Sequence, residues 1–147
     1  MAEVQIISQS LLNTVSEAAK ASPRQRKNFN FHLHDQDVCH RLINALEPDT
    51  YIPPHRHLHS AKAESIVILR GKVGVLFFDA RGILEQHHVL QPEGEIFGVN
   101  IFPGVYHSVV ALAPGSVFFE AKAGPYVPAT LEERADWAPA ENSVEAG

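Results

Sequence analysis

Histidine is concentrated in one short stretch of this sequence. Nine of the 147 residues are histidine, and three of them stand at positions 55, 57 and 59. Histidine is the commonest metal ligand in proteins and the side chain that titrates closest to neutral pH. The cluster therefore suggests a metal site or a site for acid–base chemistry.

His55 and His57 are expected to point in the same direction, because residues two apart on a strand project from one face of it. Glu64 stands at the start of the next predicted strand. His107 directly follows a tight turn at residues 103–105, where another strand begins. An antiparallel sandwich can bring these four side chains to one point.

Three imidazoles and one carboxylate form a mixed nitrogen and oxygen ligand set, which suits one divalent transition metal such as iron, zinc, nickel or manganese. The alternative is that the histidines at 55–59 are solvated loop residues and that His107 is hydrogen-bonded within a strand. Because all four residues occur together, we favour the metal site. The predicted ligands are His55, His57, Glu64 and His107.

The elements that must position these residues are mostly short strands. Residues 9–21 carry apolar side chains at helical spacing, with Ser8 or Ser10 as N-cap and Pro23 just beyond, and they predict one short helix. Residues 28–34 are interpreted as a loop or an edge strand. From residue 38 the pattern is of short apolar runs closed by turn residues, which is typical of an antiparallel sandwich or barrel, and eight strands are the number in a jelly roll. The predicted strands are 41–46, 51–57, 65–70, 72–79, 83–90, 95–101, 106–112 and 117–122.

Composition excludes several classes of protein. The net charge of -5 argues against a nucleic-acid partner. The longest apolar runs, such as residues 73–78, are far shorter than the roughly 20 residues of a membrane span, so we expect no membrane partner. The single cysteine, Cys39, cannot form an internal disulfide and is interpreted as a buried thiol, and the N-terminus shows no secretion signal. We expect a cytoplasmic protein.

At these residues the sequence resembles the cupins. The first cupin motif, two histidines followed by Glu and Gly, is matched by His55, His57, Glu64 and Gly71. The second motif is matched by Gly98, Pro103, Gly104 and His107. The resemblance implies an all-β fold, a cupin jelly-roll β-sandwich or barrel with a short N-terminal helix, and the same four metal ligands.

The sequence departs from the cupin pattern in two places. Six residues separate His57 from Glu64, where three or four are usual, so His59 is an alternative to Glu64 as the ligand that completes the coordination. Ala111 stands where the second motif usually has Asn.

Within the chain we expect an N-terminal extension at 1–34, the cupin domain at 35–127 and a tail at 128–147 that wraps the surface.

A closer resemblance, to the WbuC family of cupin-fold metalloproteins, extends over nearly the whole chain. It implies a link to bacterial surface-polysaccharide synthesis and a small polar, sugar-derived substrate. Isomerase-type and oxygenase-type chemistry both remain open, and the alternative is a non-catalytic metal-containing module that binds a sugar or an anion. The segments that carry this resemblance are 41–48, 51–57, 77–79, 119–126 and 137–139.

Four further residues are candidates for contact with a small-molecule ligand. Glu120 and Lys122 share one face of the last predicted strand. The apolar residues on the opposite face are expected to pack beneath the N-terminal helix and the tail, and they are Val117, Phe119 and Ala121. Tyr126 follows the turn at 124–125, and Arg41 can bind a carboxylate or phosphate through its guanidinium.

The apolar segment 4–7 has no obvious partner within the chain, and we therefore expect a homodimer.

Overall fold

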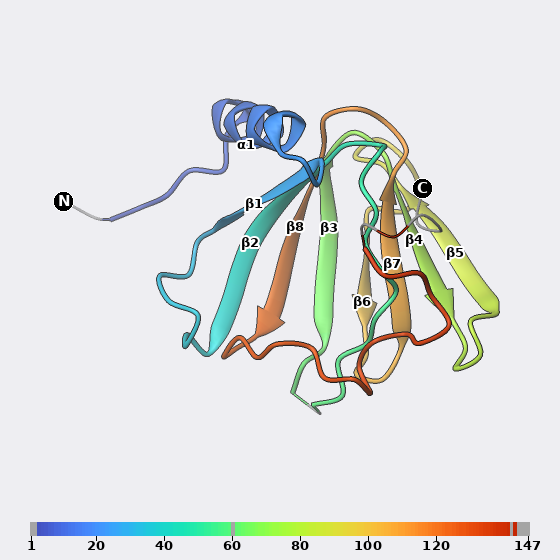
Figure 1. Ribbon diagram of the computed structural model, residues 1–147. Helices are drawn as coiled ribbons and strands as arrows, with labels where there is room; N and C mark the ends of the chain where they lie inside the picture. The colour runs from blue at the N-terminus through green and yellow to red at the C-terminus, as the bar shows by residue number, and fades with distance from the viewer. Residues whose placement is uncertain (1–2, 60, 142, 144–147) are drawn as a thin grey trace.

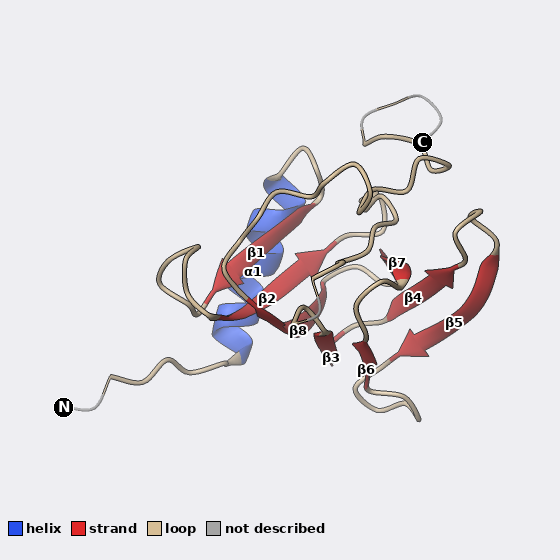
Figure 2. Cartoon of the chain, turned by 90° about the horizontal axis from the view of Figure 1, so that it is seen from below, coloured by secondary structure: helices blue, strands red, loops and turns tan. Residues whose placement is uncertain are grey.

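The computed structural model describes residues 3–59, 61–141 and 143. Two antiparallel sheets form a jelly-roll sandwich, and one helix packs on the outside of the larger sheet (Figures 1 and 2). The predicted all-β fold with a short N-terminal helix is therefore confirmed. The elements are α1 (Gln9–Ala21), β1 (Arg26–Asn30), β2 (Cys39–Leu46), β3 (Glu64–Arg70), β4 (Val73–Phe78), β5 (Leu84–Leu90), β6 (Gly98–Ile101), β7 (Tyr106–Ala111) and β8 (Ser116–Ala123).

The larger sheet has the strand order β1-β2-β8-β3-β6, and the smaller sheet has the order β5-β4-β7. The main core lies between the sheets, where β3, β4 and β7 each contribute alternate aliphatic residues. Ile66, Val75 and Val109 are examples from these three strands, and each is at most 5% exposed. This core fixes the spacing of the two sheets and so the position of the strand ends that carry the functional candidates.

The helix forms where the sequence predicts it. Its N-cap is Ser8, whose side-chain oxygen accepts a hydrogen bond from the backbone N–H of Leu11 at 3.2 Å. Leu12 and Val15 of α1 pack against Val117 of β8 in a second core on the outer face of the larger sheet. As predicted, Val117 and Phe119 of β8 lie beneath the helix, so the alternate residues of that strand face the interior of the sandwich.

The prediction of a strand at 51–57 is wrong. Pro53 and Pro54 have no backbone N–H to donate to a sheet, and His55 makes only isolated bridges, one to His107 and one to Arg134. The eighth strand is instead β1, an edge strand that pairs with β2. It begins at Arg26 and overlaps the segment interpreted as a loop or edge strand only at residues 28–30. Cys39 is exposed rather than buried, because it lies at the start of β2 near an open loop.

Two motif glycines are required by close backbone contacts. Gly71 has a φ of 79°, and a β-carbon there would collide with Ser116. A β-carbon at Gly98 would collide with the carbonyl oxygen of Ile66 on the neighbouring strand β3. Both glycines therefore allow neighbouring chain segments to approach β3, the strand that begins with Glu64.

The C-terminal tail is attached to the start of the larger sheet by an ion-pair cluster. Arg24 donates from Nε and Nη2 to the two carboxylate oxygens of Glu141 at 2.7 and 2.9 Å, and Arg26 Nη2 donates to Oε2 at 3.1 Å. The hydrogen bonds from Arg24, together with those from Arg26, lower the pKa of Glu141 to about 2. In the part of the chain that the structure describes, no helix has both the length and the apolar character needed to cross a membrane.

The Glu141 cluster should make stability depend on pH. The pKa of this carboxyl is lower in the folded protein than its ordinary value of 4.5, so its stabilising effect is present above pH 4.5 and is lost as the pH falls towards 2. We expect Glu141→Gln to lower the free energy of unfolding at pH 7 by about 1 kcal/mol, since solvent screens this surface ion pair, and to remove this part of the acid dependence. Urea denaturation at several pH values measures both effects. Glu85→Gln, at an exposed position of β5, is the control, and equal acid dependence of Glu141→Gln and the native protein would contradict the assignment.

Candidate functional site

Four side chains from three separate parts of the chain meet at one end of the sandwich. His55 and His57 come from the segment between β2 and β3, Glu64 is the first residue of β3, and His107 is the second residue of β7. One ligand atom from each residue lies within 4.8 Å of the others. The structure thus brings together the four residues that the sequence analysis singled out.

Backbone pairing holds two of the imidazoles in place. The N–H of His55 donates to the carbonyl of His107 at 3.0 Å, and the N–H of His107 donates to the carbonyl of His55 at 2.9 Å. The Nδ1 atom of His55 lies 3.0 Å from the carbonyl of Pro53, and that of His107 lies 2.9 Å from the carbonyl of Val105. With Nδ1 occupied in this way, Nε2 is the nitrogen that each ring can offer to a ligand.

Glu64 joins the histidines through a single carboxylate oxygen. Its Oε2 lies 3.2 Å from Nε2 of His57 and 3.2 Å from Nε2 of His107. Burial acts to raise the pKa of Glu64, but the hydrogen bonds from His107 and His57 outweigh burial and hold it well below its ordinary value. Glu64 is therefore an ionised carboxylate on which two imidazole nitrogens converge.

The donor set fits a divalent transition metal. Burial, reinforced by the nearby His107, lowers the pKa of His55 to about 4, so this imidazole is neutral at pH 7 and its free nitrogen can bind a cation. Glu64 is ionised, which is also the form that binds a metal. Three imidazoles and one carboxylate are a ligand set of the kind that iron, zinc, nickel and manganese accept.

A segment of the C-terminal tail supports the histidine segment from the other side. The backbone N–H of Arg56 donates to the carbonyl of Glu133 at 2.9 Å, and the N–H of Leu58 donates to Oε2 of Glu133 at 3.0 Å. The guanidinium of Arg56 lies 4.6 Å from the centre of the Tyr106 ring. Sequence reasoning missed Glu133, because nothing in its neighbourhood marks it as the partner of a segment about 75 residues away.

The structure places Glu120 and Lys122 beside this cluster. In the β3–β8 pairing, Lys122 lies opposite Glu64 and Glu120 lies opposite Ile66. Lys122 Nζ is 3.5 Å from Oε2 of Glu120. Burial, together with the negative charge of Glu64, raises the pKa of Glu120 to about 7.

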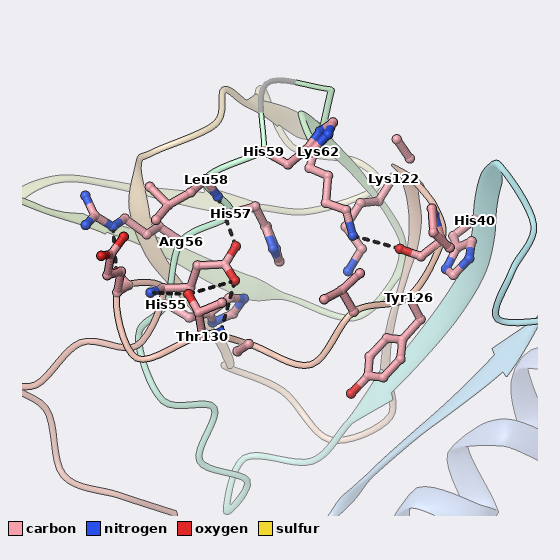
Figure 3. Close-up of a pocket in the computed structure, with 16 residues that line it drawn as sticks. His40, His55, Arg56, His57, Leu58, His59, Lys62, Lys122, Tyr126 and Thr130 are labelled. Carbon is pink, nitrogen blue, oxygen red and sulfur yellow. Dashed lines mark hydrogen bonds between the residues drawn. The ribbon is translucent and has the colours of Figure 1, made fainter.

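A cavity of about 590 Å³ opens beside His55 and His57. Figure 3 shows the residues that line it. His55 and His57 lie on one side of it, with Lys122 and Tyr126 on the other. His59 lines the cavity but lies outside the group of converging donors. Arg41 is exposed and shares the face of β2 that carries Ile43 and Ala45 beneath the helix, so the structure does not bring it to this cavity.

Comparison with solved structures identifies the same fold. KdgF from Halomonas sp. is 15% identical, with a TM-score of 0.54, and the alignment covers 72% of this chain and 84% of that one. A conserved protein of unknown function, SPY1581 from Streptococcus pyogenes, is 9% identical with a TM-score of 0.56, covering 86% of this chain and 93% of that one. An oxalate oxidase in complex with the substrate analogue glycolate is 13% identical with a TM-score of 0.53, covering 73% of this chain and 56% of that one.

The fold and the converging donors together define a cupin-fold protein with a candidate metal site. Within that class, the chain belongs to the family described as a domain of unknown function, DUF6016, which matches residues 7–90. No curated protein matches the chain.

The contact between Glu133 and Leu58 can be tested without any metal. In Glu133→Ala the N–H of Leu58 loses its acceptor, whereas the N–H of Arg56, which donates to the backbone carbonyl of residue 133, keeps its partner. We expect amide hydrogen exchange at Leu58 to become about tenfold faster and that at Arg56 to change little. Glu132→Ala, a neighbouring exposed residue, should leave both amides unchanged. Unaltered exchange at Leu58 in Glu133→Ala would show that this contact does not hold the segment.

Proposed function

We propose that this protein is a metal-dependent cupin enzyme that acts on a small polar, sugar-derived metabolite. The observation that carries the proposal is the convergence of His55, His57, Glu64 and His107 at the base of an open cavity. A metal with a purely structural role is bound by a closed set of protein ligands and needs no cavity beside it. Here the donors lie beneath a space large enough for a small molecule.

The proposed cofactor is one divalent transition metal, held by Nε2 of His55, His57 and His107 and by a carboxylate oxygen of Glu64. A bound ion of this kind supplies Lewis-acid polarisation of a substrate oxygen and, if it is iron, redox chemistry. The proposal therefore covers isomerase-type and oxygenase-type reactions.

The proposed role of Glu120, Lys122 and Tyr126 is to bind and orient the substrate. Lys122 can donate charge-assisted hydrogen bonds into the cavity, and Tyr126 offers a hydroxyl at its rim. The ion pair between Glu120 and the ammonium group of Lys122 holds Lys122 in place. Residues of the segment 123–133 line the other side of the cavity.

The sequence resemblance to the WbuC family supports a finer assignment. We propose that the protein belongs to that family and contributes to the synthesis of a bacterial surface polysaccharide in the cytoplasm. The best-matching segments include 51–57, which carries two of the proposed ligands, and 119–126, which carries the three proposed substrate contacts.

The metal assignment is tested with a matched pair of histidine variants. We expect His57→Ala to abolish stoichiometric metal binding and His59→Ala to retain it, because only His57 belongs to the converging group. Elemental analysis of protein purified with and without oxygen measures the bound metal. Bound iron would favour oxygenase-type chemistry, whereas zinc, nickel or manganese would leave isomerase, hydrolase or binding roles. Full metal content in His57→Ala would refute the ligand set.

The role of Lys122 is tested separately from metal binding. We expect Lys122→Met to keep its metal and to lose at least tenfold in affinity for those aldoses, uronic acids or hydroxy acids that bind the native protein. Saturation-transfer NMR identifies the compounds that bind, and titration calorimetry gives the affinities. Lys20→Met, on the exposed side of α1, is the control. Equal affinities in Lys122→Met and the native protein would remove Lys122 from the substrate site.

We also propose that the protein is a homodimer associated through its N-terminal segment. Val4 and Ile6 are each 69% exposed and the segment forms no strand, so its apolar side chains have no cover within the chain. We expect light scattering at micromolar concentration to give the mass of a dimer and Ile6→Asp to give that of a monomer. Ile83→Asp, at another exposed isoleucine, should remain dimeric. A native monomer would contradict this proposal.

A further inference from the structure

A second cavity, of about 540 Å³, lies on the inner face of β1, β2 and β8. It exists because the two sheets differ in width. β1 and β2 lie at the side of the larger sheet away from β4 and β5, and α1 covers only their other face (Figures 1 and 2). The inner face of these strands is therefore open along a groove. Nearly all of the side chains that line this groove are polar or charged.

Strand alternation places three asparagines in this groove. Asn28 and Asn30 project from one face of β1, and Asn44 lies opposite Asn28 on β2. Asn28 donates to the side-chain oxygen of Asn30 at 2.8 Å, and Asn44 donates to Oε1 of Glu120 at 3.1 Å. Each amide has two N–H donors and an acceptor oxygen, so all three keep unused hydrogen-bonding groups that can face a ligand.

Such a set of amides matches a ligand rich in hydroxyl groups. A hydroxyl both donates and accepts hydrogen bonds, and a side-chain amide can satisfy both roles. Leu42 is the sole aliphatic residue among those that line this groove, which therefore lacks the apolar pockets by which extended peptides are recognised. Tyr126, which is 58% exposed, adds an aromatic ring with a hydroxyl at the edge of the groove.

The charges in the groove are balanced. The two arginines share the carboxylate of Glu141, and Lys122 lies beside Glu120. Asp35 adds a further negative charge at the end of the groove nearest to His40. An anionic ligand would have to displace these internal partners, whereas an uncharged ligand leaves them in place.

The groove continues into the cavity above the candidate metal site. His40, Lys122 and Tyr126 line both spaces. The paired strands place His40, Lys122 and Glu64 in one row that crosses β2, β8 and β3. From β3 to β1 the larger sheet spans three strand spacings, about 14 Å, which is longer than a single sugar ring.

We propose that this groove binds an uncharged glycan of two or more sugar units and leads one end of it to the candidate metal site. This inference names the substrate class of the candidate metal site, and it therefore rests on the proposed function. The three asparagines contact the hydroxyl groups of the distant units. Lys122 and Tyr126 contact the unit that enters the cavity above the histidines.

The test begins with an array of uncharged and anionic oligosaccharides, from disaccharides to hexasaccharides, with a peptide array in parallel. We expect the native protein to bind uncharged oligosaccharides, and titration calorimetry with the best of them gives its dissociation constant. The double variant Asn28→Ala, Asn30→Ala should bind that oligosaccharide about tenfold more weakly. Both side chains are exposed, so the variant should fold normally. Asn13→Ala, at an exposed position of α1, is the matched control and should bind as the native protein does.

His57→Ala separates this proposal from the metal assignment. His57 lies outside the groove, so the roughly tenfold loss of affinity caused by the two asparagine substitutions should also be measured in a His57→Ala background, whether or not that background holds a metal. A native protein that carries stoichiometric metal and binds no oligosaccharide would overturn the groove proposal alone. Binding restricted to anionic oligosaccharides or to peptides would overturn it too, as would native affinity in the double asparagine variant.

Discussion

The exchange of backbone hydrogen bonds between His55 and His107 is the constraint on which the candidate metal site depends. His55 belongs to a segment without regular strand pairing, and this short bridge connects that segment to β7. The bridge sets the two imidazole rings 4.5 Å apart, centre to centre. Since Nδ1 of both rings is occupied by a carbonyl, the ring orientation follows from the backbone. The donor geometry is therefore built into the fold and does not depend on free rotation of long side chains.

The pairing of β3 with its neighbours supplies the rest of the site. Glu64 is buried at the first position of β3, where the register places it between Lys122 of β8 and Ile101 of β6. A buried carboxylate needs compensation, and two imidazole nitrogens together with the nearby ammonium group provide it. The close approach of β6 to β3 requires a residue without a side chain at Gly98. Thus a glycine far from Glu64 in sequence helps to hold the carboxylate under the histidines.

Much of this arrangement could be predicted from the sequence, and the failures have physical causes. The helix and most strands follow from local periodicity, and the four converging residues follow from motif spacing. The strand predicted at 51–57 fails because Pro53 and Pro54 cannot donate to a sheet, a restriction that apolar content alone does not reveal. The hydrogen bond by which Glu133 supports the histidine segment joins residues about 75 positions apart, so no local sequence pattern predicts it. Arg41 was expected near the ligand, but strand parity puts it with Ile43 on the helix side, where it remains exposed.

The larger sheet has five strands and the smaller sheet has three, so part of the inner face of the larger sheet is covered and part is open. Where the smaller sheet covers the larger one, aliphatic side chains fill the space, and residues such as Val73 and Leu90 are fully buried. Beyond the smaller sheet, the same inward alternation continues on β1 and β2, but the inward residues there include Asn28 and Asn44. Polar side chains on an open inner face avoid the exposed apolar patch that aliphatic residues would create. The four candidate metal ligands lie at one end of the sandwich, and the row of paired residues from Glu64 to His40 connects them with this open polar face. The strand register therefore connects a buried cluster of candidate metal ligands to an open polar face on one continuous sheet.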